Sequence, residues 1–143
     1  MPRIQRILDD LTRNGPTLEV RVEPILDVQE VLRAEGLPVP FATLLGMIDT
    51  GASGTLVEPD VFKPLNMKPF ALARLRTAST VRPLMRGQYR ARIVLARSLA
   101  FEVDVVAGSL IGQDVQCLIG RDILEQVVLT YDGPRGRFSV KMP

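Results

Sequence analysis

The stretch LLGMIDTGAS, residues 44–53, leads an apolar run into an acid, Asp49, and then into a turn of small residues. Thr, Gly, Ala and Ser leave little bulk around a carboxylate and bring it close to backbone N–H groups. The alternative is an ordinary turn in which Asp49 merely ends a strand. Because the tripeptide Asp-Thr-Gly is short, the choice between the two depends on the rest of the chain.

A second stretch, CLIGRDIL at residues 117–124, places Gly120 directly after two aliphatic residues. Glycine has no Cβ, so a strand that ends there can run close behind another turn. The segment between the two stretches is long enough to hold several strands.

The residue types that are missing restrict the chemistry. The 143 residues include no histidine and one cysteine, Cys117, which its apolar neighbours predict to be buried. Histidine-dependent catalysis, histidine-ligated metals, disulfides within the chain and multi-cysteine metal sites are therefore excluded. Any catalysis must use carboxylates, hydroxyls, Lys, Arg or Tyr, and carboxylates lead that list.

The composition is that of one ordinary globular domain, with 46% hydrophobic and 24% charged residues. The net charge is only +2, and the arginines between residues 74 and 97 enclose one aromatic residue, Tyr89, so a solvated strand face is favoured over a nucleic-acid site. No apolar run is long enough to cross a membrane, and acids replace the apolar core of a secretory signal in residues 1–10. We therefore expect a cytoplasmic protein without membrane contact.

Hydrophobic periodicity predicts a mostly β chain with short helices. Residues 2–13 place Ile4, Ile7, Leu8 and Leu11 on one stripe, which predicts an amphipathic helix that ends at the Asn-Gly-Pro of 14–16. This divides the chain into an N-terminal helical extension, 1–16, and a domain, 17–143. Residues 27–36 have helical spacing but are ambiguous. Strands are expected at 17–25, 41–48, 56–57, 71–77, 88–96, 99–106, 117–120, 127–131 and 137–142, short helices at 59–65 and 121–126, and a connecting loop at 79–87.

Taken together, residues 47–52 and 118–124 resemble the two motifs of the retropepsin-like aspartic proteases. The resemblance implies a closed β domain with a short C-terminal helix over 17–143, and a homodimer with C2 symmetry. Each subunit would supply one Asp49, and a water held between the two carboxylates would attack a peptide bond of a peptide or protein substrate. Such a mechanism needs no metal or other cofactor.

The resemblance also assigns roles to other residues. Thr50 would hydrogen-bond across the dimer, and Gly51 would offer its carbonyl to the substrate. A flap is expected between Thr77 and Tyr89. The residues expected to bind substrate are Ala52, Ser53, Thr77, Ala78, Ser79, Leu84 and Met85, and those expected to support the site are Leu118, Ile119, Gly120, Arg121 and Asp122.

Three features differ from the retroviral members of that family. The expected flap has one glycine, Gly87; Ser53 and Gly54 stand where acids are usual; and a helix is predicted where those enzymes begin with a strand. The first two keep open an alternative function, a non-catalytic dimer of the same fold that binds peptides or partner proteins. For Arg121 and Asp122, surface charges that open a short helix are an equal alternative to structural hydrogen bonds.

Overall fold

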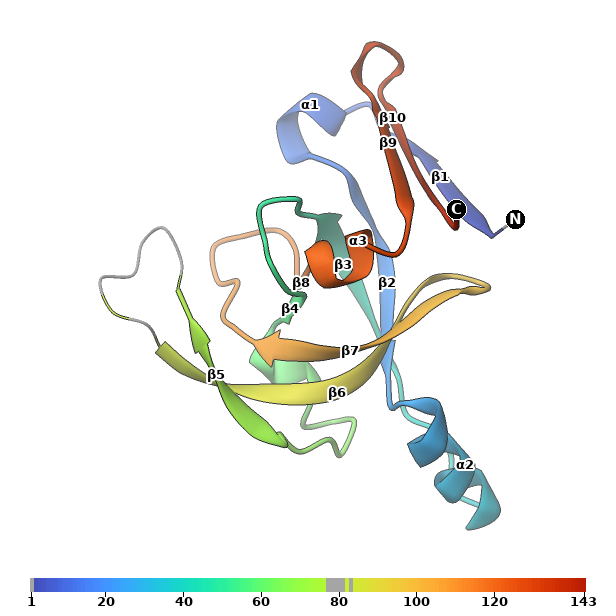
Figure 1. The fold of residues 1–143 in the computed structure, drawn as a ribbon, viewed down its shortest axis with the longest axis vertical. Coiled ribbons are helices and arrows are strands. Elements are labelled where there is room, and N and C mark those ends of the chain that lie inside the picture. The colour runs from blue at the N-terminus through green and yellow to red at the C-terminus, as the bar shows by residue number, and fades with distance from the viewer. Residues whose placement is uncertain (1, 77–81, 83) are drawn as a thin grey trace.

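The computed structural model describes residues 2–76, 82 and 84–143. Two β-sheets and a few short helices form this part of the chain (Figure 1), which confirms the mostly β class. The strands are β1 (Arg3–Ile7), β2 (Thr17–Glu23), β3 (Ala42–Ile48), β4 (Leu56–Val57), β5 (Ala71–Leu75), β6 (Leu84–Ala96), β7 (Leu99–Ala107), β8 (Cys117–Ile119), β9 (Val128–Asp132) and β10 (Arg137–Lys141). The helices are α1 (Leu11–Asn14), α2 (Leu26–Ala34) and α3 (Arg121–Leu124), with 3₁₀ turns at Pro59–Val61 and Gly133–Arg135. None of the helices described here has the length and apolar character needed to span a bilayer.

Six strands close into a barrel in the order β2-β3-β8-β4-β7-β6, because β6 pairs back onto β2. Every second side chain along β7 is buried, and the second half of β6 follows the same alternation. Strands with this period turn one set of side chains into a shared core. The barrel interior is therefore filled by aliphatic and aromatic side chains that the alternating sequence pattern had placed on inner faces.

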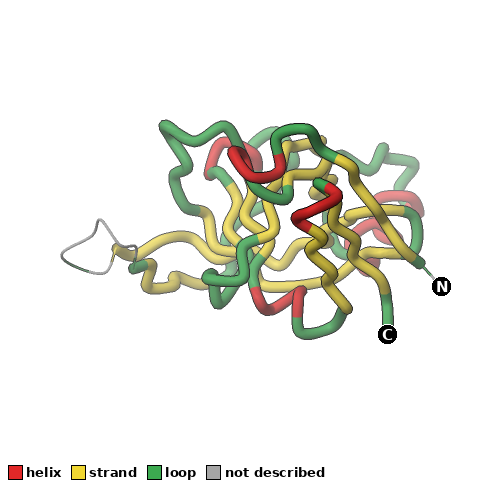
Figure 2. Tube along the Cα trace, turned by 90° about the horizontal axis from the view of Figure 1, so that it is seen from above, coloured by secondary structure: helices red, strands yellow, loops and turns green. Residues whose placement is uncertain are grey.

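The β5–β6 hairpin extends from one side of the barrel, away from the chain termini (Figure 2). Its strand β6 begins at Leu84, so the prediction of a connecting loop over 79–87 is wrong for residues 84–87. The cross-strand pairing of Leu84 with Leu75 and of Gly87 with Leu72 keeps these residues extended. The expected flap residues Thr77, Ala78 and Ser79 lie outside the described residues.

The N-terminal segment corrects the predicted amphipathic helix over 2–13. Residues Arg3–Ile7 form β1, which pairs antiparallel with β10, and only Leu11–Asn14 are helical. The helical stripe was misleading because Ile7, one of its members, points to solvent with 70% of its surface exposed. The pairing with β10 satisfies the backbone groups of β1 that face that strand, and the outward groups of this edge strand face solvent. Leu11 is then buried in the short helix that follows.

The centre of the fold is the three-strand unit β3-β8-β4. Strand β8 runs parallel to β3 and antiparallel to β4, so it lies between two strands that are joined by residues 49–55. That connection must cross the end of β8. The sequence stretches 44–53 and 117–124 are thereby brought together, although they lie far apart in the chain.

At the other end of the molecule, α2 projects beyond the barrel (Figure 1). The ambiguous segment 27–36 is thus largely helical. The N–H of Leu26 donates to Glu102 Oε2 at 2.7 Å, and the amide of the buried Gln29 donates to the carbonyl of Pro24 at 2.6 Å. These polar contacts join the helix to the barrel, whereas its apolar residues Val28 and Val31 are exposed.

Candidate active site

Asp49 is the first residue after β3 and begins the turn that crosses β8. Its N–H donates to the carbonyl of Ile119 at 2.9 Å, which continues the pairing of β3 with β8. Its carboxylate Oδ1 accepts the N–H of Gly51 at 2.9 Å, and its carbonyl accepts the N–H of Ala52 at 3.2 Å. The turn therefore fixes the carboxylate of Asp49, which is half-buried, while Thr50, Gly51 and Ser53 are exposed.

The second motif supports this turn from below. A Cβ on Gly120 would lie 2.4 Å from the backbone carbon and oxygen of Gly54, so only glycine allows the two segments to approach this closely. The N–H of Arg121 donates to the carbonyl of Ala52 at 2.9 Å, and its guanidinium Nη1 donates to the carbonyl of Thr50 at 2.9 Å. Arg121 thus binds the backbone of the turn at two points.

The half-buried Asp122 and the fully buried Thr55 form a further part of the same support. The carboxylate of Asp122 accepts the Thr55 hydroxyl at 2.8 Å, the Thr55 N–H at 3.1 Å and the Ile123 N–H at 2.9 Å. The Thr55 hydroxyl in turn accepts the N–H of Gly120 at 3.2 Å. For Arg121 and Asp122, structural hydrogen bonds are therefore a better interpretation than solvated surface charges.

Cys117 lies at the start of β8, beside Gly46 of β3. Its side chain is fully buried, as its apolar neighbours predicted. Burial, and to a smaller extent the charge of Asp122, raises the pKa of its thiol to about 12. The thiol is consequently neutral near pH 7 and is not a nucleophile.

The structure brings most of the expected site residues together. Residues 49–53 form the turn, Gly120, Arg121 and Asp122 lie beneath it, and Leu118 and Ile119 pair with Met47 and Ile48 of β3. Leu84 and Met85 lie on β6 with exposed side chains. Thr55 was not predicted from the sequence, since a threonine that precedes a short strand carries no signal of a buried hydrogen bond to a residue so distant in the chain.

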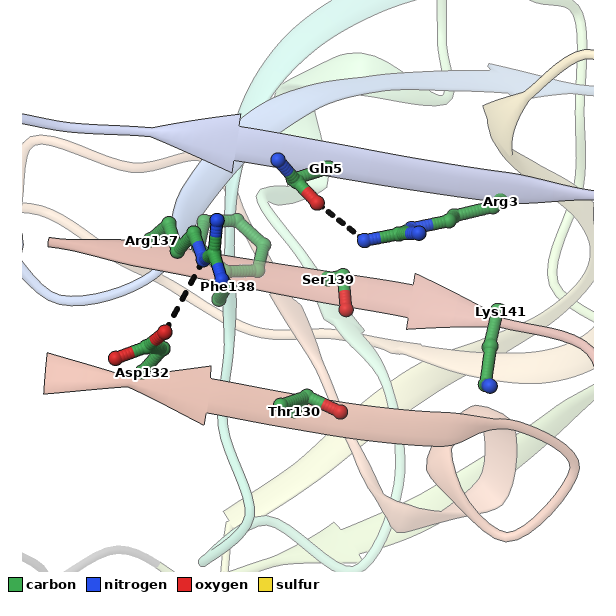
Figure 3. A pocket seen from close by; sticks show the side chains of 8 residues that line it. All are labelled: Arg3, Gln5, Thr130, Asp132, Arg137, Phe138, Ser139 and Lys141. Carbon is green, nitrogen blue, oxygen red and sulfur yellow. Dashed lines mark hydrogen bonds and ion pairs between the residues drawn. The ribbon is translucent and has the colours of Figure 1, made fainter. Parts of the chain in front are cut away.

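A cavity of about 170 Å³ on the sheet β1-β10-β9 offers different chemistry (Figure 3). Its one acid among the lining residues, Asp132, bonds to Arg137 at 3.1 Å. Arg3 and Lys141 are direct cross-strand neighbours on the same face. The carboxylate of Asp132 is held in an ion pair with Arg137, so this cavity has no unpaired carboxylate among its lining residues for acid–base chemistry. The Asp49 turn is therefore the stronger candidate.

Comparison with known proteins addresses the fold. No protein-family model matches the chain, and no curated protein matches it. Among solved structures, a retropepsin-like aspartic protease from Rickettsia conorii superimposes with a TM-score of 0.56 and 16% sequence identity, over 99% of this chain and 91% of that chain. The chain has a retropepsin-like fold. In that fold the β3-β8-β4 unit and the Asp49 turn make up the part of the molecule in which both sequence motifs meet.

Proposed function

We propose that the protein is an aspartic endopeptidase that acts as a C2 homodimer, with one Asp49 from each subunit in a shared site. The observation that carries the proposal is the position of the Asp49 carboxylate, held by the Gly51 N–H on a turn of small residues in which Thr50, Gly51 and Ser53 are exposed. One chain contains one such turn, so a pair of carboxylates requires two copies. The retropepsin-like fold supports the same assignment.

Two carboxylates about 3 Å apart cannot both ionise easily, so they share a proton and titrate as a coupled pair. This behaviour is that of aspartic-protease dyads in general and is transferred to Asp49 from them. The ionised member would take a proton from the bound water as the general base. The protonated member would donate a hydrogen bond to the carbonyl of the scissile peptide bond and polarise it.

Two neighbours of Asp49 have supporting parts in this mechanism. Thr50 is exposed next to Asp49, where its hydroxyl would hold the two turns in register across the dimer axis. Arg121 binds the Thr50 carbonyl, so it would fix the backbone of that contact without touching the substrate. An extended peptide would then add its backbone between the turn and the β5–β6 hairpin.

The direct test is the cleavage of a denatured protein at mildly acidic pH by wild type and by Asp49→Asn. The amide has the shape of the carboxylate but cannot act as a base, so we expect cleavage to be lost. Asp60→Asn, which removes an exposed acid elsewhere on the surface, is the matched control and should cleave as wild type does. Equal cleavage by wild type and Asp49→Asn would contradict the proposal. Absence of cleavage by a wild-type dimer would favour the non-catalytic peptide-binding alternative.

A mixing experiment tests the shared site separately. When wild type and Asp49→Asn are mixed in equal amounts and allowed to exchange subunits, about one quarter of the dimers have two Asp49 residues. Cleavage should therefore fall to about one quarter of the value of the same total amount of wild type. A fall to only one half would show that each chain works alone, and the homodimeric mechanism would be wrong.

A further inference from the structure

An apolar groove lies between α2 and the segment that leads into β5. It has a volume of about 470 Å³, and most of the residues that line it are aliphatic, aromatic or proline. Strand β3 begins next to this groove and ends at the Asp49 turn. Its seven residues separate the two places by about 20 Å. The groove is therefore a feature distinct from the candidate active site. Its apolar lining consists of Pro24, Ile25, Val28, Leu32, Leu37, Pro38, Pro40, Leu65, Met67 and Phe70.

The polar lining of the groove has one sign of charge. It consists of Asn66, Lys68 and Arg90, and no carboxylate belongs to the lining residues. The guanidinium Nη1 of Arg90 donates a hydrogen bond to Asp104 Oδ1 at 3.0 Å, and the other guanidinium N–H groups are further donors. Lys68 makes no ion pair within the described part of the chain. The groove thus combines an apolar wall with cationic hydrogen-bond donors.

The apolar wall is incompletely covered. Val28, Leu37 and Phe70 line the groove and leave 45%, 48% and 58% of their surfaces exposed. These residues come from three separate segments and face one space, so a single ligand could remove all three from water. Covering apolar surface is favourable by about 25 cal/mol per Å². The volume lies within the range of about 300–1,000 Å³ that is usual for sites of small ligands with a few polar groups to orient them.

We propose that this groove binds a small amphiphile with one carboxylate, of the kind represented by a medium-chain fatty acid. The hydrocarbon part would lie against α2, Leu37 and Phe70, and the carboxylate would accept hydrogen bonds from Lys68 and Arg90. The charge of the lining selects the head group, since a cationic head would meet like charge and a neutral one would supply no opposite charge to Lys68. This site is independent of the proposed peptidase activity.

The test is a titration of the ¹⁵N-labelled full chain with three eight-carbon probes: octanoate, 1-octanol and octylammonium. Amide shifts should concentrate in α2 and in the segments around Leu37 and Lys68. Octanoate should bind about fivefold more tightly than 1-octanol, as is usual for one partly exposed ion pair, and octylammonium should bind most weakly. Equal affinities for the three probes, shifts that map elsewhere, or no binding of octanoate would each overturn the proposal.

Matched variants identify the contacts. Lys68→Glu should weaken octanoate binding by about fivefold or more and strengthen octylammonium binding, while Lys63→Glu makes the same charge change at an exposed residue outside the groove and should leave both unchanged. Leu37→Ala should weaken both probes about fivefold by removing apolar contact, and Leu72→Ala, an exposed leucine outside the lining, should not. Self-association of the chain that Leu37→Ala abolishes would assign the groove to a second copy and overturn the ligand proposal.

Discussion

Among the described residues, one buried polar side chain lies at each end of the barrel, and these two side chains differ in which parts of the chain they connect. Thr55 lies under the Asp49 turn and Gln29 lies in α2, and they are the buried polar residues of the described chain. Thr55 bonds to Gly120 and Asp122, which are more than sixty positions away. Gln29 bonds to Glu23, Pro24 and Arg33, all within six positions.

The difference separates a site that depends on the tertiary fold from a local attachment. The bonds of Thr55 form only when β8 lies between β3 and β4, so they hold the turn, the end of β8 and α3 as one unit. The bonds of Gln29 join α2 only to the residues just before it and to its own next turn, and they leave the apolar side of α2 exposed. We therefore expect a substitution at the Asp49 end to destabilise the whole site, whereas a substitution at the α2 end should have only a local effect.

The largest effect should come from Gly120→Ala. The added Cβ would lie 2.4 Å from the Gly54 backbone, and neither backbone segment can move without breaking the hydrogen bonds of the turn. We expect a loss of about 3 kcal/mol in the free energy of unfolding, as for severe overpacking, and loss of cleavage. Urea denaturation and the cleavage assay measure the two. Gly54→Ala is the control on the other side of the same contact. The nearest atom to its new Cβ is 4.0 Å away, so we expect little loss of stability. Equal losses of stability in the two variants would show that the contact is not the cause.

Thr55→Val should have the next largest effect. Valine keeps the shape of threonine but leaves the buried N–H of Gly120 without its acceptor, which should cost about 2 kcal/mol in the free energy of unfolding. The neutral thiol of Cys117 lies within the same unit, so its alkylation rate in the native protein should rise as the unit opens. Thr43→Val, an exposed change on β3, is the control. An unchanged alkylation rate in Thr55→Val would contradict the view that Thr55 connects the unit.

Gln29→Leu should have a smaller and local effect. It removes the bonds to Glu23 and Pro24 near the start of α2, with a loss of about 1 kcal/mol in the free energy of unfolding. Cleavage and Cys117 alkylation should match wild type, because no bond of Gln29 reaches the Asp49 turn. A fall in cleavage as large as that of Thr55→Val would remove the distinction between the two ends.

The distance over which an interaction acts also decides how much of the structure the sequence could predict. The alternating second half of β6 and the whole of β7 were predictable, since each pattern is local. The Asp49 turn and Gly120 were predictable because short motifs mark them. The strand β1 was not, because its stability comes from β10 at the other end of the chain.

The same reasoning explains what was missed at the two ends of the barrel. No local pattern relates Thr55 to Asp122, and the predicted site therefore lacked its buried hydroxyl. The apolar groove was missed because Val28, Leu37 and Phe70 lie in three separate segments that only the fold brings together. In both cases the residues were present in the sequence, and the information that joins them is tertiary.

The ion pairs of Asp132 with Arg135 and Arg137 provide a third kind of attachment, partly exposed and short in range, and should show the smallest effect. Loss of water around Asp132 acts to raise the pKa of its carboxyl, but the charge and hydrogen bonds of Arg135, with a hydrogen bond from Arg137, outweigh it and lower the pKa. A carboxyl whose pKa is lower in the folded than in the unfolded state stabilises the fold above its ordinary pKa, and this contribution disappears as the pH falls through the lowered value.

Asp132→Asn should therefore be slightly less stable than wild type near pH 7 and equally stable at a pH below the folded pKa. The difference should be small because solvent screens the pair. Urea midpoints measured from pH 7 downward test this, and Arg135→Gln should remove part of the same pH dependence. A constant difference between wild type and Asp132→Asn over the whole range would show that the ion pairs are not its source.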